Sequence, residues 1–442
     1  MAKTYDSYKD SGIAWIGEIP EGWKTNRLKY LCSIATGNKD TQDSEEDGIY
    51  KFYVRSPIIE HSNSWTFEGE GILMAGDGAG AGRVFHHAFG KYAVHQRVYR
   101  MADFKSINTN FLYYYLSSLF CRIMDMGSAQ STVPSVRLPM LTNFVVCIPP
   151  LSEQQSIASF LDTKCGEIDS LISLQEEMIS ELQAYKQSVI TEAVTKGLDP
   201  NAKMNCCASR EKNDACISSS ETQPAIERKF KDSGVEWIGE IPEGWKVSPL
   251  KYIIKGHLQY GANESGVLYE EGLPRYVRIT DILDNKLRED IQKQSLTEQQ
   301  AEGFILKNND ILFARSGGTV GKSFIYKSEY GRCAFAGYLI KASINDDNDA
   351  EFVYFFTQSS AYDEWKRRIF IQATIQNIGA DKYSQLEIPL PFKEMQTKIV
   401  SFLKDKTSQI DSLISLKQQK IDELKSYKKS IIYEYVTGKK RV

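Results

Sequence analysis

The sequence predicts an α+β protein organised as a pseudo-twofold repeat, in which two mixed domains are joined by two long helices that form an antiparallel intramolecular coiled coil. Three observations lead to this prediction. A 23-residue block occurs twice, short strand-forming and helix-forming runs follow each copy, and each half closes with a long helix-forming segment carrying an apolar stripe. A chain of 442 residues also exceeds the usual size of one hydrophobic core, so at least two domains are expected.

The repeated block marks the start of each half. Residues 8–30 read YKDSGIAWIGEIPEGWKTNRLKY, residues 230–252 read FKDSGVEWIGEIPEGWKVSPLKY, and 17 of the 23 positions are identical. Further blocks match in the same order, among them ILMAGDGAGAGRVF with ILFARSGGTVGKSF. The ends of the two halves are nearly identical whereas the middles have diverged. This contrast suggests that each middle recognises something different.

The divergent middles combine short strands and helices. AVHQRVYRM in the first half and AFAGYLIKA in the second are strand-like, whereas FLYYYLSSLF and EFVYFFTQSSAYDEWKRRI have helical character. We therefore expect one compact α+β domain over residues 1–150 and a second over residues 230–391.

The long helices are expected over residues 151–197 and 392–442. Each contains apolar residues at the same offsets of 0, 3, 4, 11, 14 and 21. A helix with one such stripe buries it against a partner, and the other copy is the obvious partner. The residues expected in the interface are Ile168, Leu171, Ile172, Ile179, Leu182, Val189, Ile410, Leu413, Ile414, Ile421, Leu424 and Ile431.

Charge supports the pairing of these two helices. Residues 161–197 contain three basic and seven acidic residues, a net charge of −4, whereas residues 403–439 contain eight and five, a net charge of +3. Opposite charges favour pairing within one chain over pairing of like helices from two chains. The alternative is that these are two solvated faces whose charges have drifted independently.

Composition points to a globular protein with an expected cytoplasmic location. The chain is 42% hydrophobic and 25% charged, and no apolar run reaches the ~18–20 residues of a membrane span. The opening MAKTYDSYKD lacks the apolar core of a signal peptide. The polar stretch 198–229 predicts an exposed linker. Its Cys206, Cys207 and Cys216 have no nearby histidine, so we expect no metal site there.

The Gly-rich stretch ILFARSGGTVGKS raises the question of a nucleotide site. A phosphate-binding loop of the form GxxxxGK[ST] requires glycine where Ser316 stands. The first copy has Arg83 and Val84 in place of the pair 322–323, although a nucleotide site would keep its lysine and hydroxyl. A turn that presents Arg83 or Lys322, with Arg315 nearby, to a DNA phosphate fits both copies better.

Two further pairs are candidates for contacts with bases. Arg55 in FYVRSP aligns with Arg278 in RYVRITDI, and Gln130 aligns with Gln372. Arginine and glutamine can bind guanine and adenine edges through two hydrogen bonds, although these residues could equally hold loops in place. With a net charge of −3, DNA binding must rest on local patches or on a partner. No catalytic motif is evident, so no catalytic residue is expected.

In combination, several motifs resemble the specificity subunit of type I restriction-modification enzymes. They are KDSGxxWIGEIPEGWK before each variable region, the helix entries IPPLSEQQSIASFL and IPLPFKEMQTKIVSFL, and the IDSLISL helices that end at AVTKG and YVTGK. The resemblance covers nearly the whole chain. It departs from the family pattern at residues 205–229, where relatives pass almost directly to the second KDSG block.

The resemblance implies two target-recognition domains, each reading one half of a split double-stranded DNA site. It implies that the helices set the spacing of the half-sites and dock two methyltransferase subunits. It also implies that this chain is not an enzyme and binds no cofactor. S-adenosylmethionine would be used by the methyltransferase subunits, and ATP and Mg by nuclease/translocase subunits of the full complex.

Three other functions are compatible with parts of the sequence. One is a nucleotide-dependent hydrolase built on ARSGGTVGKS. Another is a non-catalytic scaffold whose duplicated domains bind proteins, which would lack salt-sensitive, sequence-dependent DNA binding. The third is a family member that serves a methyltransferase alone, without a nuclease partner.

Overall fold

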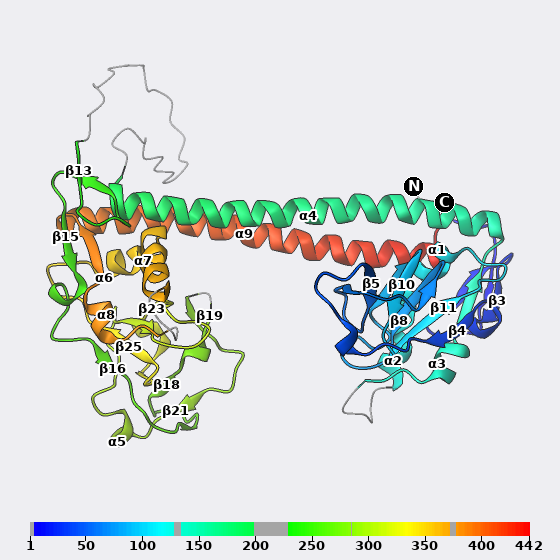
Figure 1. Cartoon of the computed structure of the whole chain (residues 1–442), viewed down its shortest axis with the longest axis horizontal. Coiled ribbons are helices and arrows are strands. Elements are labelled where there is room, and N and C mark those ends of the chain that lie inside the picture. Colours follow the sequence, from blue (N-terminus) through cyan, green and yellow to red (C-terminus); the bar gives the residue numbers. More distant parts are fainter. Residues whose placement is uncertain (1–3, 128–133, 199–228, 284, 372–376) are drawn as a thin grey trace, which may run out of the picture. The chain divides into compact units, whose positions relative to one another are not determined.

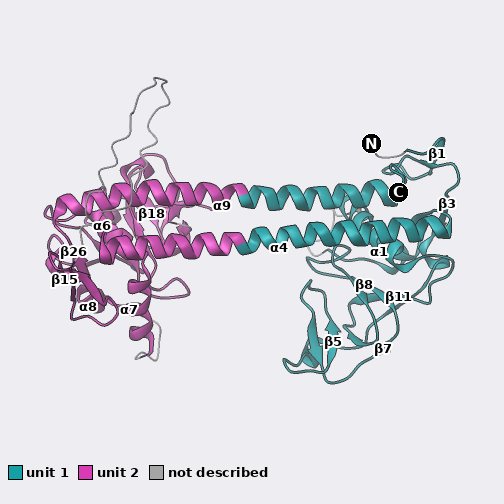
Figure 2. Ribbon diagram, turned by 90° about the horizontal axis from the view of Figure 1, so that it is seen from above, with its two compact units in different colours: residues 1–177, 417–442 teal, residues 178–416 magenta. Residues whose placement is uncertain are grey.

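The computed structural model of the chain describes residues 4–127, 134–198, 229–283, 285–371 and 377–442. The chain divides into two compact units (Figure 2). Unit 1 comprises residues 1–177 and 417–442, and unit 2 comprises residues 178–416. Each unit therefore contains one α+β domain together with part of each long helix.

Unit 1 contains two four-stranded sheets, two two-stranded sheets and three short α-helices among its described residues, and Figure 1 shows their arrangement. One four-stranded sheet has the order β4-β11-β8-β9, and the other, β6-β5-β10-β7, contains the parallel pair β5–β10. β1 pairs with β2, and β3 with β12. The bounds are β1 Tyr8–Asp10, β2 Glu18–Pro20, β3 Lys24–Arg27, β4 Ser33–Thr36, β5 Tyr50–Tyr53, β6 Glu60–Ser62, β7 Phe67–Glu68, β8 Gly71–Ala75, β9 Phe85–Ala88, β10 Lys91–Val94, β11 Val98–Ala102, α1 Thr109–Leu119, α2 Cys121–Gly127, α3 Leu138–Thr142 and β12 Val145–Ile148.

Unit 2 repeats the first four-stranded sheet and the two small sheets of unit 1, whereas its second four-stranded sheet differs in the outer strands. Its sheets have the orders β16-β25-β22-β23 and β17-β21-β18-β24, the second again with one parallel pair, β18–β24. The pairs β13–β14 and β15–β26 match the small sheets of unit 1, and a hairpin, β19–β20, is added. The bounds are β13 Phe230–Asp232, β14 Glu240–Pro242, β15 Lys246–Pro249, β16 Gln259–Tyr260, β17 Val267–Leu268, β18 Arg275–Val277, β19 Ile282–Leu283, β20 Lys286–Leu287, β21 Gln294–Ser295, α5 Glu298–Ala301, β22 Ile311–Ala314, β23 Ser323–Ile325, β24 Cys333–Phe335, β25 Leu339–Ala342, α6 Ala350–Phe356, α7 Ser360–Ile371, α8 Ala380–Ser384 and β26 Glu387–Leu390.

The repeated sequence block forms the same hairpin in both units. The Asp10 carboxylate accepts a hydrogen bond from Gly12 N (3.0 Å), and Asp232 accepts one from Gly234 N (2.9 Å). Both glycines have φ above +70°, a conformation that glycine adopts without strain. The following Trp23 is buried in the unit's core, as is its counterpart in unit 2. The block is therefore the structural base of each domain.

The two long helices are α4 (Leu151–Lys196) and α9 (Lys393–Val436), and they pair antiparallel within each unit. In unit 1 the Phe160 ring packs on the Tyr435 ring with centroids 4.5 Å apart, and Lys428 forms an ion pair with Asp169. In unit 2 the matching ion pair joins Lys186 of α4 to Asp411 of α9. No described helix is long and apolar enough to cross a membrane.

The buried seam of the helices differs from the predicted stripe at two positions. Leu171 and Leu413 are 47% and 48% exposed, although both were expected in the interface. Seam positions follow the alternating spacing of four and three residues of a two-helix coiled coil, and these leucines stand beside that seam. The other ten stripe residues are buried or half-buried, namely Ile168, Ile172, Ile179, Leu182, Val189, Ile410, Ile414, Ile421, Leu424 and Ile431.

The same seam contains polar residues that an apolar search overlooks. Gln175 and Lys186 of α4, and Lys417 and Lys428 of α9, occupy seam positions of the four-three spacing. Lys417 Nζ donates to Gln175 Oε1 at 3.3 Å. Polar residues at seam positions reduce stability but select one register. The polar residues of the seam therefore help to specify the register in which the two helices pair.

Candidate nucleic-acid interface

A Gly-rich turn connects β8 to β9 in unit 1 and β22 to β23 in unit 2. Gly82 N donates to Ala75 O in one unit, and Gly321 N donates to Ala314 O in the other, each at 2.9 Å. Both glycines have positive φ, 65° and 81°. An antiparallel strand follows each turn, whereas a nucleotide-binding phosphate loop opens a helix. The geometry therefore excludes the phosphate loop considered for ARSGGTVGKS.

Two other segments of unit 1 meet this turn. Gly76 N donates to the carbonyl of Arg97, in the β10–β11 connection, at 2.8 Å. Val136 N, which follows the undescribed residues 128–133, donates to Gly76 O at 2.7 Å. We call residues 76–83, 95–97 and 135–136 turn cluster 1.

Unit 2 holds its turn with the same two backbone bonds. Arg315 N donates to Tyr338 O at 3.1 Å, and Ile378 N donates to Arg315 O at 2.9 Å. We call residues 315–322, 336–338 and 377–378 turn cluster 2. The two clusters thus share one backbone arrangement.

The side chains at matching positions of the two clusters are different. The matched pairs, with the residue of unit 1 first, are Gly76 and Arg315, Asp77 and Ser316, Arg83 and Lys322, Gln96 and Gly337, and Arg97 and Tyr338. In four of these five pairs, a charged or amide residue in one unit corresponds to a residue of another chemical class in the other unit. A shared backbone arrangement with different side chains suits two sites that bind different DNA sequences.

Asp77 organises the charged side chains of turn cluster 1. Its Oδ1 accepts a hydrogen bond from Arg55 Nη1 at 3.0 Å, and its Oδ2 accepts one from Arg97 Nη1 at 2.5 Å. The side chains of Arg55 and Arg97 are 42% and 60% exposed, whereas that of Asp77 is 17% exposed. Partial burial by itself raises the pKa of Asp77, but the bonds from Arg97 and Arg55 outweigh it and lower the pKa below its ordinary value. Asp77 therefore stays ionised between the two guanidinium groups.

Arg83 and Lys322 occupy matching places but have different surroundings. Arg83 Nη2 donates to Asp125 Oδ1 at 2.5 Å, and both side chains are more than half exposed. Lys322 is exposed and forms no ion pair with described residues. An exposed ion pair is easily opened, so either cation can reach a phosphate.

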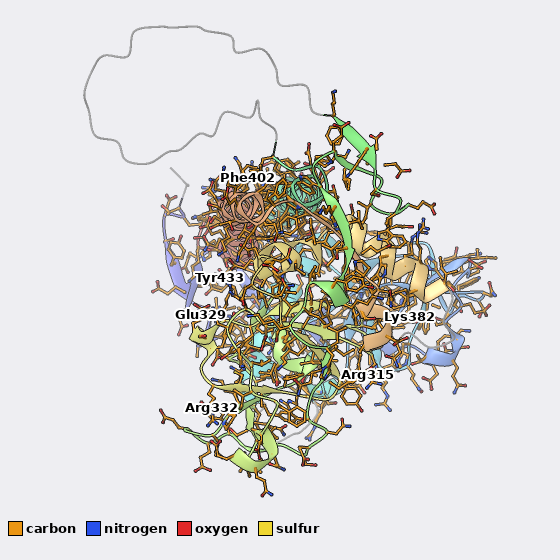
Figure 3. All side chains as sticks on the ribbon, turned by 90° about the vertical axis from the view of Figure 1, so that its left-hand side faces the viewer. Arg315, Glu329, Arg332, Lys382, Phe402 and Tyr433 are labelled. Atoms are coloured by element: carbon orange, nitrogen blue, oxygen red, sulfur yellow. The ribbon has the colours of Figure 1, made fainter. Side chains whose placement is uncertain are left out.

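Arg315 is the central cation of turn cluster 2. Its guanidinium carbon lies 5.0 Å from the centre of the Tyr260 ring, and Tyr260 Oη accepts a hydrogen bond from Ala380 N at 3.0 Å. The Arg315 side chain makes no hydrogen bond to described residues, and it lies on the same side of unit 2 as Lys382 (Figure 3). Stacking on an aromatic ring holds the planar group, while its donors make no hydrogen bond to the described residues.

The side chain of Arg278, in contrast, is hydrogen-bonded to residues of its own domain. Its Nε and Nη2 donate to the two carboxylate oxygens of Asp281 at 3.1 and 2.8 Å, and Asp281 is buried. The side chain also donates to Gln292 O at 3.2 Å. Arg278 thus fastens the short 3₁₀ turn that follows β18.

The family model described as "Type I restriction modification DNA specificity domain" matches the chain twice, over residues 20–184 and 242–426.

The chain belongs to this family.

Relatives and a solved structure agree with this assignment. The type I restriction enzyme EcoDI specificity subunit of Escherichia coli is 25% identical over 388 residues, which are 87% of this chain and 81% of that protein. The MjaVIII specificity subunit of Methanocaldococcus jannaschii is 23% identical over 413 residues, 87% of this chain and 86% of that protein. A structure described in work on complex assembly and conformational transition of the type I R-M system has a TM-score of 0.65 at 15% identity, covering 95% of this chain and 98% of that chain, and supports the fold.

As a specificity subunit, the chain is a non-catalytic, DNA-recognising component of a type I restriction-modification system. Family membership therefore supports the specificity-subunit interpretation over the hydrolase and scaffold alternatives. Among the described residues, no group of three or more His, Cys, Asp or Glu is arranged to hold a metal. Cys206, Cys207 and Cys216 lie outside the described residues.

The specificity subunit brings together only some of the residues singled out in the sequence. Arg83, Lys322 and Arg315 lie in the turn clusters, and Arg55 joins cluster 1 through Asp77. Gln130 and Gln372 lie outside the described residues.

The alignment of Arg55 with Arg278 is off by one residue. Tyr53 pairs with Val94 on β10, whereas Val277 pairs with the matching residue of β24, Phe335. Arg278 therefore corresponds to the residue before Arg55. Because side chains alternate along a strand, a shift of one residue sends them to opposite faces.

Four residues in or beside the turn clusters of the specificity subunit were missed in the sequence, namely Asp77, Arg97, Tyr260 and Tyr338. Arg97 and Tyr338 could have been found by aligning AVHQRVYRM with AFAGYLIKA, which places them opposite each other. Tyr260 carries no such signal, because its contact with Arg315 joins residues 55 positions apart.

Proposed function

We propose that each unit reads one half of a bipartite double-stranded DNA target through its turn cluster. The observation that carries the proposal is the shared backbone of the two clusters combined with their different side chains. If both clusters read the same sequence, selection would favour the same side chains at the matched positions. Different half-sites require different donors and acceptors at those positions.

The proposed division of labour follows the segments of the chain. Residues 1–150 and 230–391 serve as the two target-recognition domains, and residues 198–229 link the halves. Residues 151–197 and 392–442 serve as arms that set the spacing between half-sites. α4 alone has 46 residues, about 69 Å at ~1.5 Å per residue. Arms with one register give a fixed spacing, which a flexible linker would not.

The arms also offer two similar docking surfaces for methyltransferase subunits. In unit 1, Leu171 and Leu174 of α4 are exposed together with Tyr427 of α9. The same repeat positions are exposed in unit 2, and the matching residues are Leu413, Leu416 and Tyr185. Exposed apolar residues on a helix surface are typical of protein interfaces. Two equivalent sets suit two copies of one partner.

The chemistry is assigned to the partner subunits. Methyltransferase subunits would use S-adenosylmethionine to methylate adenine, and nuclease/translocase subunits would use ATP and Mg. This chain would bind none of these cofactors. A cytoplasmic location, where chromosomal DNA is present, is part of the same proposal.

The test is to sequence the methylated adenines of a host that expresses this chain with its cognate methyltransferase subunit. The measurement is repeated after residues 25–145 are replaced by another recognition domain, and again after a separate replacement of residues 247–387. We expect one bipartite motif in which each replacement changes a different half. A motif without two halves, or a replacement that changes both halves, would contradict the proposal.

A further inference from the structure

The Arg55–Asp77–Arg97 group differs from the other ion pairs near the turn clusters. One carboxylate binds two guanidinium groups, each through a single Nη1 atom. A guanidinium has five N–H donors, so both arginines keep most of their donors for a ligand. Arg97 is the more exposed of the two, with 60% of its side chain accessible.

Asp77 is placed to orient Arg97 rather than merely to neutralise it. Asp77 is positioned by the Gly-rich turn and is only 17% exposed, so its carboxylate is held by the surrounding structure. A planar guanidinium bonded to a fixed carboxylate loses rotational freedom before DNA arrives. Less entropy is then lost on binding, which favours a contact that requires a defined orientation.

We propose that Arg97 reads a guanine in the half-site bound by unit 1, and that Asp77 is the positioning residue that aims it. The inference rests on the proposed function, because it assumes that unit 1 reads a half-site. The contact would be the donation of two N–H groups to O6 and N7 of guanine in the major groove, the commonest specific contact of arginine.

The charge of the group favours a base over a phosphate as the ligand. Two arginines and one aspartate carry a net charge of +1, so one of the two cations is already neutralised. Phosphate contacts depend mainly on uncompensated charge, and a point charge without a fixed plane, such as a lysine ammonium, can make them. A bidentate contact with guanine needs the plane and gains less from charge.

Turn cluster 2 lacks this arrangement. Ser316 replaces the aspartate, and Tyr338 replaces the outer arginine. Its arginine, Arg315, stands one residue earlier and stacks on Tyr260 instead. The proposed guanine contact therefore belongs to the half-site of unit 1 only. The half-site of unit 2 serves as an internal reference in the methylation experiment.

The experiment uses the full chain with its cognate methyltransferase subunit. A plasmid library carries every single-base variant of the half-site assigned to unit 1 by the domain replacement, and adenine methylation is measured for each variant. The substitutions are Arg97→Lys, which keeps the charge but not the fork, and Asp77→Asn, which keeps the shape but not the charge. Arg27→Lys is the matched control, because Arg27 is exposed on β3, in a different sheet.

We expect Arg97→Lys to reduce the preference for guanine at one position of this half-site by about 5- to 150-fold. Asp77→Asn should reduce the preference at the same position, and the double substitution should add little, because both changes act on one contact. The other half-site and the Arg27→Lys variant should keep the original motif. An unchanged second half also shows that the variant is folded.

Three results would overturn the inference while leaving the proposed function intact. The first is a uniform loss of methylation across all sequences, which a phosphate contact predicts. The second is an effect of Arg97→Lys at a position that is not guanine. The third is an effect of Asp77→Asn at a position other than the one that Arg97→Lys affects. In contrast, the absence of a bipartite motif for the unchanged chain would remove the proposed function and this inference together.

Discussion

Removing the Lys–Asp pairs between α4 and α9 should loosen the two helices by the same amount in both units. Lys186 Nζ donates to both carboxylate oxygens of Asp411 at 2.6 and 2.7 Å, and Lys428 Nζ donates to those of Asp169 at 2.7 and 2.6 Å. The lysines stand at matching repeat positions, as do the aspartates. The chain therefore contains one interaction twice.

The exposure of these side chains sets the expected magnitude. Both lysines are 29% exposed, and the aspartates are 56% and 57% exposed. Exposed ion pairs contribute ~0.2–1 kcal/mol, and the seam position of the lysines places these pairs at the upper end of that range. The ~3–5 kcal/mol cost of breaking a buried pair does not apply, because the aspartates are open to water. We expect a coupling free energy of about 1 kcal/mol for each pair.

Amide hydrogen exchange in the helices measures each unit separately. Lys186→Met, Asp411→Asn and their double variant form one mutant cycle, and Lys428→Met with Asp169→Asn forms the other. Each single variant should speed exchange in its own helical half about fivefold, which corresponds to 1 kcal/mol.

Lys420→Met is the control for these cycles, because its partner Glu423 lies on the same helix and both side chains are exposed. It should change exchange only slightly. A coupling free energy below about 0.3 kcal/mol in both units, or a difference above about 0.5 kcal/mol between them, would contradict an equal stabilising contribution of the two ion pairs.

Three further experiments test the seam and the clusters. Ile421 is 1% exposed, so Ile421→Ala should lower the free energy of unfolding by ~2–5 kcal/mol. Leu413 is 48% exposed, so Leu413→Ala should lower it by less than about 1 kcal/mol. Equal shifts of the urea midpoint for the two variants would contradict the four-three seam. Gly82→Ala should destabilise more than Gly78→Ala in the same assay, because its Cβ would come within 2.8 Å of a methionine side chain while that of Gly78 meets nothing within 4 Å. Arg315→Ala should alter only the half-site read by unit 2 in methylation sequencing, and a change in the other half would count against turn cluster 2 as a separate reader.

The two long helices show which features sequence periodicity can predict and which it cannot. The repeated offsets identified both helices, and ten of the twelve residues that they placed in the stripe are buried or half-buried. The offset of three also selected Leu171 and Leu413, because three-residue spacing alone does not distinguish a seam position from its neighbour. Gln175 and Lys186 were passed over because the search counted apolar residues only. The packing of the partner helix, which the apolar pattern alone does not specify, determines which edge of the stripe stays exposed to water.

The clusters were less predictable because their contacts are long-range. Aligning the repeats located Arg83 and Lys322, whose backbone is the same in both halves. The same alignment misplaced Arg278, because the register of β18 against β24 depends on strand pairing and not on the local sequence RYVR. The contact of Arg97 with Asp77 joins residues 20 positions apart on two strand ends. No local sequence pattern predicts an ion pair between residues so far apart in the chain.

The Lys–Asp pairs determine the register of the helices but not the choice of partner. IDSLISL is identical in α4 and α9, and the pairing lysine follows the aspartate by 17 residues in both. Two copies of α4 from separate chains could therefore form the same pairs in the same antiparallel register. The choice must come from what differs, and the largest difference is the net charge of −4 against +3. Reversing the charge of α9 residues outside the seam should leave the register intact while removing the preference for pairing within one chain, and light scattering would then detect dimers that the unchanged chain does not form.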